Sequence, residues 1–476
     1  MKKYDVVVIG GGSGGYTAAI RCAQLGLKTV LIEKDKNKKG QTLLGGTCLN
    51  VGCIPSKSLL ESSAFFAKIK NESSAFGIKT TGLQIDVAAM QKRKNSIVDK
   101  LTSGIAMLLK SHDIEIINAK AKLLSNKRVL LDYSDNYSTK ISAHSIIIAT
   151  GSHPMELNCA KIDNEFIVNS TAALSWNSVP KNLGIIGAGA VGLEIGSIWA
   201  RLGAKVTIFE ALDFLSFTDT DVQRTALSML RKQGLNIHLK TLVQEAKVEN
   251  SQVTVVFQED KKQVQKLVFD KLLVAAGRVP NSSDITSKDS QLVFDEGGYI
   301  HINEERGGTS IPGVYAIGDI VRGSALAHKA SAEGIAVAER LAGIKTNINY
   351  NAIASVIYTE PEIAQVGKTS QQLKAEGINF KAGKFPFIAN GRALAANTGH
   401  GFIKILSDVK TDQILGVHII GQHSSEIIHL GVVAIEFEAT CEDFLQVCMA
   451  HPSLSEAFNE AILDTKNIAI NILRKL

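Results

Sequence analysis

Two cysteines lie five positions apart in the segment GGTCLNVGCIPSK, which spans residues 45–57. Such a pair could be two free core thiols, half of a zinc site, a structural disulfide or a redox-active disulfide. On an ideal helix, the Cα atoms of residues five apart lie roughly 8–9 Å from each other, farther than a disulfide allows. A bridge between Cys48 and Cys53 therefore needs a distorted turn, for which Gly52 and Pro55 are suited. A bridge strained in this way is easier to reduce than a structural one.

The rest of the chain favours the redox interpretation. No second pair of Cys or His residues stands nearby at zinc-ligand spacing, so we predict no metal site. The N-terminal apolar run in MKKYDVVVIGGG is too short for a secretion signal. Five glycines and Glu194 interrupt the apolar stretch at residues 183–200, which argues against a membrane span. We therefore expect a cytoplasmic protein, and in that compartment a disulfide is typically catalytic.

Length and charge describe an ordinary globular protein of several domains. With 476 residues, 45% of them hydrophobic, the chain is long enough for two to four domains. Its net charge of +6, from 52 basic and 46 acidic residues, is mild for this size. The densest basic run, KDKNKKG at residues 34–40, contains no aromatic residue, so we interpret it as a surface loop and expect no nucleic-acid partner.

A glycine-rich pattern occurs twice. The segment DVVVIGGGSGGYTAAIRCAQLGLKTVLIEK begins at residue 5, and LGIIGAGAVGLEIGSIWARLGAKVTIFEA begins at residue 183. The offset between them is constant, since 187 − 10 and 210 − 33 both give 177. The matched positions are Gly10 with Gly187, Gly12 with Gly189, Gly15 with Gly192, and Glu33 with Glu210.

Each copy has the context of a dinucleotide-binding βαβ unit, because it follows an apolar run, opens a helical stretch and precedes a second strand that ends in Glu. The first glycine permits a tight turn, the second lets the backbone approach a pyrophosphate, and the third lets the helix pack on the strand. The glutamate accepts hydrogen bonds from the adenosine ribose. Two such sites favour a flavoprotein that exchanges electrons with a nicotinamide. Glu210 would repel the extra phosphate of NADP, and no Arg follows it directly, so we predict NAD.

These motifs resemble those of the flavin-dependent pyridine nucleotide–disulfide oxidoreductases, nearly from end to end. The segment at residues 45–57 resembles the family's redox-active segment. Further motifs are IIIATGS at 146–152, LLVAAGRVPN at 272–281, GVYAIGDI at 313–320, LAHKASAEG at 326–334 and HPSLSE at 451–456. Within the family, the chain resembles the NAD-linked members that oxidise dihydrolipoamide to lipoamide.

The resemblance implies an α/β fold with two Rossmann-like dinucleotide-binding domains and a C-terminal α+β dimerisation domain. The FAD domain would comprise residues 1–149 and 277–348, the NAD domain 150–276, and the interface domain 349–476. It implies one non-covalently bound FAD per chain, NAD+ or NADH as the second cofactor, and a homodimer. The implied partner is the lipoyl domain of a 2-oxoacid dehydrogenase or glycine cleavage complex.

The resemblance also implies roles for individual residues. Cys48 is then the outer thiol that reacts with the substrate, and Cys53 is the inner thiol beside the flavin. His451, oriented by Glu456, is the base that reaches the disulfide of the other subunit. The further residues with an implied role are Lys57 and Glu194, paired beside the flavin, Asp319 on the ribityl chain of FAD, and Thr150, Gly151, Gly277 and Arg278 in cofactor binding.

Three alternatives stay open at this stage. Glutathione reductases typically carry Lys where Ser56 stands and use NADP. Mercuric reductases have a C-terminal cysteine pair, whereas this chain ends in NILRKL. A non-catalytic scaffold subunit would not need the intact cysteines and the HPSLSE motif. One departure from the family is Met449, where many relatives have a second histidine. The remaining cysteines, which we interpret as packing residues, are Cys22, Cys159, Cys441 and Cys448.

Overall fold

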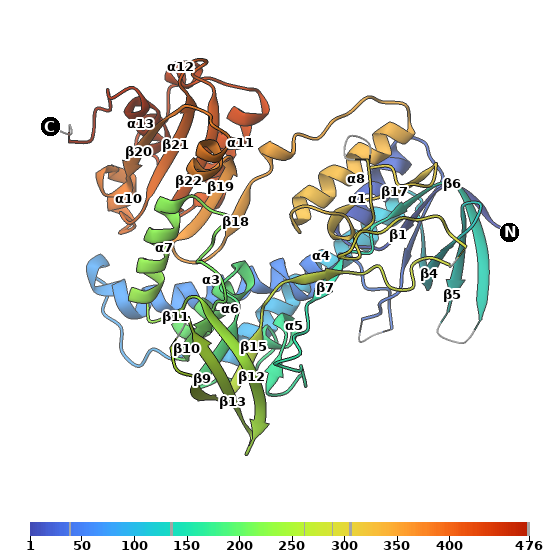
Figure 1. Cartoon of the computed structure of the whole chain (residues 1–476), viewed down its shortest axis with the longest axis horizontal. Coiled ribbons are helices and arrows are strands. Elements are labelled where there is room, and N and C mark those ends of the chain that lie inside the picture. The colour runs from blue at the N-terminus through green and yellow to red at the C-terminus, as the bar shows by residue number, and fades with distance from the viewer. Residues whose placement is uncertain (38–39, 134–136, 261, 288, 304–306, 474–476) are drawn as a thin grey trace. The chain divides into compact units, whose positions relative to one another are not determined.

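The computed structural model describes residues 1–37, 40–133, 137–260, 262–287, 289–303 and 307–473, and its chain forms two compact units (Figure 1). The first unit comprises residues 1–58, 89–155 and 277–348, and the second comprises residues 59–88, 156–276 and 349–476. The α/β class predicted from the sequence is confirmed. The division into three domains stays a prediction.

The first unit is built on a mixed sheet whose strands run in the order β3-β2-β1-β6-β5-β4, with β17 also paired to β6. The strands β1, β2, β3, β6 and β17 are parallel neighbours, so apolar runs such as VVVI at residues 6–9 are buried throughout. The strands are β1 (Lys3–Ile9), β2 (Thr29–Glu33), β3 (Glu115–Asn118), β4 (Lys120–Leu124), β5 (Arg128–Asp132), β6 (Ser138–Ile148) and β17 (Val314–Ala316), with a separate pair of β7 (Ser152–Pro154) and β16 (Arg278–Pro280).

Helices α1 and α8 pack closely against each other in this unit. An ideal Cβ on Gly334 would lie 2.6 Å from the carbonyl oxygen of Gly14, so only glycine allows this approach. Arg21 on α1 and Glu339 on α8 form an ion pair of 2.7 Å at the same contact. The helices of this unit are α1 (Ser13–Gln24), α2 (Gly46–Val51), η2 (Gly318–Ile320) and α8 (Ala327–Leu341), while α3 (Cys53–Glu72) starts here and α4 (Val87–Ser111) ends here; η1 (Ser73–Phe76) follows α3.

The second unit repeats the same parallel topology. Its strand order β11-β10-β9-β15 matches the order β3-β2-β1-β6 of the first unit, with β8 added beside β15. A three-stranded antiparallel sheet, β12-β13-β14, is inserted before β15. The elements are β8 (Ile167–Val168), α5 (Ser170–Ala173), β9 (Asn182–Ile186), α6 (Ala190–Arg201), β10 (Lys205–Phe209), α7 (Thr220–Lys232), β11 (Asn236–His238), β12 (Thr241–Glu249), β13 (Gln252–Glu259), β14 (Gln265–Phe269) and β15 (Lys271–Val274).

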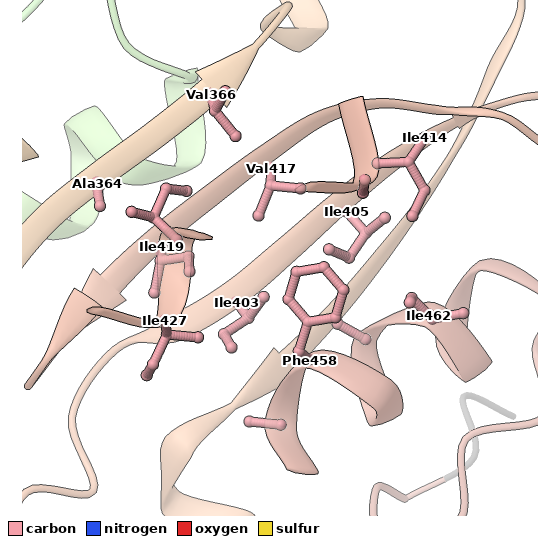
Figure 2. Close-up of a cluster of buried hydrophobic side chains, with 14 of the residues drawn as sticks. Ala364, Val366, Ile403, Ile405, Ile414, Val417, Ile419, Ile427, Phe458 and Ile462 are labelled. Carbon is pink, nitrogen blue, oxygen red and sulfur yellow. The ribbon is translucent and has the colours of Figure 1, made fainter. Parts of the chain in front are cut away.

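The C-terminal part of the second unit is an antiparallel sheet in the order β18-β19-β22-β21-β20. Helices α11 and α13 pack on it over an apolar core, in which Phe458 and Ile462 of α13 face Ile403 and Ile405 of β21 (Figure 2). The elements are η3 (Tyr350–Ala352), β18 (Ser355–Ile357), β19 (Glu362–Gly367), α9 (Ser370–Ala375), β20 (Phe380–Pro386), η4 (Phe387–Ala389), α10 (Gly391–Ala395), β21 (Phe402–Asp408), β22 (Ile414–Gly421), α11 (Ser424–Glu436), α12 (Cys441–Leu445) and α13 (Glu456–Thr465).

The basic run at residues 34–40 follows β2. Lys34, Asp35, Lys36 and Gly40 are exposed, as predicted for a surface loop, whereas residues 38 and 39 lie outside the described residues. Among the helices that the structure describes, none is long and apolar enough to cross a bilayer.

Candidate active site and cofactor sites

The first glycine turn joins β1 to α1. Gly10 has a φ of +108°, which disfavours any side chain, and its N–H donates to the carbonyl oxygen of Ile32 at 2.8 Å. An ideal Cβ on Gly15 would lie 1.8 Å from the carbonyl oxygen of Gly10, so helix and strand meet only because Gly15 has no side chain. The Glu33 carboxylate accepts hydrogen bonds from the N–H of Gly11 at 2.8 Å and of Asp35 at 3.0 Å. The turn is thus locked to the end of β2.

The second turn, between β9 and α6, has the same geometry. Gly187 has a φ of +105°, and a Cβ on Gly192 would lie 2.0 Å from its carbonyl oxygen. The Glu210 carboxylate accepts from the N–H of Ala188 at 2.7 Å and of Leu212 at 2.9 Å. Each of these contacts within the βαβ unit therefore has a counterpart 177 residues later, as the sequence repeat predicts.

Both turns fit a dinucleotide pyrophosphate. Gly12 and Gly189 precede the helices with an extended backbone, and a Cβ on Gly189 would meet nothing within 4 Å, while one on Gly12 would meet only the Cα of Gly46 at 3.8 Å. Within the described ranges, neither helix has a side-chain cap or an acidic residue in its first turn. The N–H groups at these helix ends are thus available to an anion, and the open space above each second glycine lets it approach.

The redox segment is attached directly to the first glycine turn. The N–H of Gly45 donates to the carbonyl oxygen of Gly11 at 2.8 Å. A Cβ on Gly46 would lie 2.7 Å from the Cα of Gly12, so the two backbones touch. The Asn50 side chain stabilises the start of α2, because its amide donates to the carbonyl oxygens of Leu44 at 2.9 Å and Gly46 at 2.8 Å. The cysteines are thereby held next to the first glycine turn.

Gly52 interrupts the helix between the two cysteines. Cys48 lies in α2, α2 ends at Val51, and Cys53 is the first residue of α3. Gly52 has φ −134° and ψ −114°, and a Cβ there would lie 2.9 Å from the carbonyl oxygen of Thr47. This is the distorted turn expected from the spacing.

The two cysteines are half-buried thiols in the structure and interact with each other. A hydrogen bond with Cys53, together with burial, raises the pKa of the Cys48 thiol, while the positive charge of Lys57 opposes the shift. The disulfide itself, and the roles of inner and outer thiol, stay predictions. The contact between the sulfur groups is what a reversible bridge requires.

Asp319 lies in a hydrogen-bonded group that the sequence indicated only in part. The hydroxyl of Ser152 donates to Asp319 Oδ2 at 2.6 Å, and Arg278 Nε donates to the same hydroxyl at 2.7 Å. Arg278 also donates to the carbonyl oxygen of Ser152 at 2.6 Å. Asp319 and Arg278 were predicted site residues, whereas Ser152 was missed although it ends the IIIATGS motif. Burial lowers the pKa of Arg278, and the charges of Asp319 and Cys53 oppose this shift.

Two further residues of this unit were missed, Lys329 and Glu333 on α8. Both are buried, and they form an ion pair of 3.1 Å. Glu333 accepts from the N–H of Gly318 at 2.7 Å, and Lys329 donates to the carbonyl oxygen of Gly318 at 3.2 Å. The pair therefore fixes the peptide groups just before Asp319. The signal was the Lys and Glu four residues apart in LAHKASAEG.

The predicted residues Thr150, Gly151 and Gly277 lie where the chain leaves and re-enters the first unit. Asn281, also missed, donates its N–H to the carbonyl oxygen of Gly151 at 2.9 Å and its amide to that of Thr150 at 2.8 Å. The carbonyl oxygen of Gly277 accepts from the N–H of Met155 at 3.0 Å. These hydrogen bonds join the segment at residues 150–155 to the segment at residues 277–281.

His451 and Glu456 are brought together as predicted. His451 Nδ1 and Glu456 Oε1 are 2.7 Å apart, and the other carboxylate oxygen accepts from the N–H of Ser453 at 2.8 Å. Although burial raises it, hydrogen bonds from Ser453 and His451 lower the pKa of Glu456 below its ordinary value. The His451 side chain is 80% exposed. Met449, which replaces a histidine, packs against the core of the C-terminal sheet.

Glu194 and Lys57 belong to different units, and their pairing stays a prediction. Glu194 is buried in α6 and accepts from the N–H of Tyr358 at 3.0 Å. One interpretation was wrong: Cys448 is exposed and is not a packing residue, because the segment after α12 leaves its side chain at the surface. Cys22 and Cys441 are buried, as predicted, and Cys159 is partly buried. In the part of the chain that the structure describes, no three His, Cys, Asp or Glu side chains are grouped to hold a metal ion.

Comparison with known proteins agrees with this geometry. The sequence profile described as pyridine nucleotide-disulphide oxidoreductase matches residues 4–334, and the profile of that family's dimerisation domain matches residues 353–462. The chain belongs to this family. Members of the family use FAD and NAD(H), and so does this enzyme. The dimerisation domain supports a homodimer.

The relatives are similar over nearly their full length. Dihydrolipoyl dehydrogenase of Cupriavidus necator is 46% identical over 474 residues, which cover 99% of this chain and 100% of the relative. Mitochondrial dihydrolipoyl dehydrogenase 2 of Arabidopsis thaliana is 43% identical, with 98% and 91% covered. Leghemoglobin reductase of Glycine max is 42% identical, with 97% and 87% covered.

Solved structures share the fold. LpdA of Mycobacterium tuberculosis has a TM-score of 0.88 at 23% identity, with 97% of this chain and 99% of that chain covered. The HOCl-induced flavoprotein disulfide reductase RclA of Escherichia coli has a TM-score of 0.85 at 26% identity, with the same coverage. The similarity to the first of these concerns the fold alone.

Proposed function

We propose that this protein is an NAD-dependent dihydrolipoyl dehydrogenase, which converts dihydrolipoamide and NAD+ into lipoamide, NADH and a proton. The observation that carries the proposal is the backbone contact between the redox segment and the first glycine turn, where the N–H of Gly45 donates to Gly11 at 2.8 Å. It keeps a pair of adjacent thiols beside one dinucleotide site. The names of the full-length relatives supply the substrate class.

The thiol chemistry proceeds by exchange. In the oxidised enzyme Cys48 and Cys53 are joined, and a substrate thiolate attacks the Cys48 sulfur to form a mixed disulfide, releasing Cys53 as thiolate. The second substrate thiol then attacks the substrate sulfur in the mixed disulfide, which closes lipoamide and releases Cys48. The substrate has lost two electrons and two protons, and the cysteine pair is reduced.

Proton transfer needs a base, because the thiolate is the nucleophile. His451 takes the substrate proton at Nε2, while Glu456 holds its Nδ1 at 2.7 Å and stabilises the charged ring. In our proposal His451 serves the cysteines of the other chain of the homodimer, which agrees with its high exposure in the single chain.

The residues that would hold the flavin are those of the first turn with Glu33, Asp319 and the redox segment. A bound FAD would supply the two-electron chemistry that links the cysteine pair to NAD+. The residues that would hold NAD+ are those of the second turn, where the Glu210 carboxylate would accept from the ribose hydroxyls. Lys57, paired with Glu194 in our proposal, supplies positive charge next to the flavin.

The lipoyl group would be presented by the lipoyl domain of a 2-oxoacid dehydrogenase or glycine cleavage complex. The cytoplasmic location predicted from the sequence is part of this proposal, and cell fractionation tests it.

The deciding experiment compares two reactions of the purified protein. We expect rapid NAD+ reduction with free dihydrolipoamide, followed at 340 nm, and no comparable NADPH oxidation with oxidised glutathione. Cys48→Ser should abolish the first reaction. Cys448→Ser, which changes an exposed cysteine outside the site, is the matched control and should retain it. Activity with glutathione but not with dihydrolipoamide would refute the proposal.

A further inference from the structure

A row of polar side chains crosses the C-terminal sheet on the face opposite its apolar core. Ile403 and Ile405 of β21 point into the core (Figure 2), so the residue between them faces the other way. Cross-strand pairing continues from that residue in both directions along the sheet. The row consists of Gln365 on β19, His418 on β22, Lys404 on β21 and Lys384 on β20.

Two members of this row are buried ionisable groups. His418 is 0% exposed and Lys404 is 8% exposed. Burial lowers the pKa of His418 to about 4, so its ring is neutral at physiological pH. Lys404 forms ion pairs with two carboxylates, Asp219 at 2.8 Å and Asp221 at 2.9 Å.

Side chains of this row contact the segment that joins β10 to α7, residues 210–219. Asp219 caps α7 and is fully buried. Its Oδ1 accepts from Lys404, and its Oδ2 accepts from the N–H of Ser370 at 3.1 Å and its hydroxyl at 2.5 Å. Burial raises the pKa of Asp219, but the hydrogen bonds from Lys404 and Ser370 outweigh it and lower the pKa well below its ordinary value.

Backbone groups of the same segment are held as well. Gln365 donates to the carbonyl oxygen of Phe217 at 3.0 Å. Gln371 donates to that of Thr218 at 3.0 Å, and its own amide oxygen accepts from the N–H of Thr220 at 3.3 Å. The C-terminal sheet and α9 therefore fix the last three residues of the segment from several directions.

The other end of the segment, at Glu210, belongs to the second dinucleotide site. Glu210 accepts from the glycine turn at Ala188 and from Leu212, inside the segment itself. Between the two ends, Phe214 and Leu215 are buried, and Leu215 has a φ of +45°. A non-glycine residue in this conformation is retained only where its surroundings hold it. Eight residues thus lie between Asp219 and the Glu210 carboxylate, and at least two of them are held by burial.

We propose that Lys404 and Asp219 are positioning residues for NAD(H), which hold segment 210–219 so that Glu210 meets the adenosine ribose. The inference rests on the proposed function only for the identity of the nicotinamide cofactor. Its consequence is that Lys404, a residue of the dimerisation domain, influences the NAD(H) affinity of the second glycine turn in the same unit.

The test is Asp219→Asn, measured as equilibrium binding of ADP-ribose by calorimetry. Asn still caps a helix, so α7 should start normally, but one of the two negative charges that pair with Lys404 is lost. We expect the Kd to rise between about 2- and 30-fold, with the FAD content and the limiting rate of FAD reduction at saturating NADH unchanged. Asp213→Asn is the matched control, since Asp213 lies in the same segment but is exposed and pairs with the exposed Lys240 at 3.4 Å.

A second variant covers the case in which Asp219→Asn does not fold. Gln371→Ala removes the hydrogen bond to Thr218 of the segment and the one from Thr220 of α7 without leaving a buried charge, and we expect a Kd for ADP-ribose at least about twice that of wild type. Lower thermal stability with an unchanged Kd in the variants that fold would overturn the proposal. ADP-ribose binding does not involve dihydrolipoamide, so this test stands even where the lipoamide assay fails.

Discussion

Replacing Gly189 with Ala should weaken NAD+ binding without destabilising the fold. Gly189 has φ −76° and ψ −175°, a conformation open to any residue, and a Cβ there would meet no atom within 4 Å. Gly189→Ala should therefore change the free energy of unfolding by no more than about 0.5 kcal/mol. The space that the methyl group enters is the one through which a pyrophosphate approaches the start of α6.

The third glycine of the same turn behaves in the opposite way. A Cβ on Gly192 would lie 2.0 Å from the carbonyl oxygen of Gly187 and 3.3 Å from Ile185 Cγ2. Backbone must move to admit it, and overpacking of this kind costs about 1–3 kcal/mol. Gly192→Ala should therefore lower stability, whereas Gly189→Ala should not.

The assay is calorimetric titration with NAD+, together with thermal unfolding and FAD content. For Gly189→Ala we expect NAD+ affinity to fall at least about tenfold, or 1.4 kcal/mol, with full FAD content and an unchanged melting temperature. Gly104→Ala, at a helical glycine of α4 with open space around its Cβ, is the control and should leave both cofactors unaffected. Wild-type NAD+ affinity in Gly189→Ala would refute the assignment of this turn.

The remaining predictions concern the residues that carry the chemistry. Cys48→Ser should keep a long-wavelength absorbance from a Cys53 thiolate against the flavin, and Cys53→Ser should lose it; bands in both variants, or in neither, would contradict the assignment of inner and outer thiol. Glu210→Ser should narrow the preference for NAD+ over NADP+ in kcat/KM, and an unchanged preference would contradict its role. Because the pKa of Glu456 is lowered, its carboxylate stays ionised as the pH falls from 9 to about 6. The infrared carboxylate signal that Glu456→Gln removes should therefore be constant over that range, and loss of this signal on acidification would show that Glu456 titrates there. A hybrid dimer of one Cys48→Ser chain and one His451→Gln chain should recover about half of the wild-type activity, and no recovery would mean that His451 serves its own chain.

The two glycine turns could be predicted in detail because their constraints are local. A positive φ at Gly10 and the 1.8 Å approach at Gly15 depend on residues within one βαβ unit, and the sequence repeats them at a constant offset. The helix break at Gly52 could likewise be predicted, since a disulfide between residues five apart requires a distorted turn. The capping of α7 by Asp219 follows the same local logic.

The buried polar groups could not be predicted, because their partners are distant in the sequence. Lys404 stands in the apolar strand FIKILSD, and nothing in that strand indicates a carboxylate 185 residues earlier. The hydrogen bond from Ser152 to Asp319 spans 167 residues, and Arg278 completes the group from a third segment. A burial pattern predicts that such a side chain needs a partner, but only the tertiary fold decides which one.

The same local geometry serves two different tasks in the two turns. Around the first turn, the redox segment touches the backbone at Gly12 and donates from Gly45 to Gly11, so this turn is packed against the chain's own redox segment. Around Gly189, no described atom lies within 4 Å of the position that a Cβ would take. A turn that another segment contacts suits a cofactor that stays bound through every catalytic cycle, and a turn without such a contact suits one that must leave as NADH each time. In our proposal the first turn holds FAD and the second holds the nicotinamide, so what packs against each turn distinguishes them, because the turns themselves are alike.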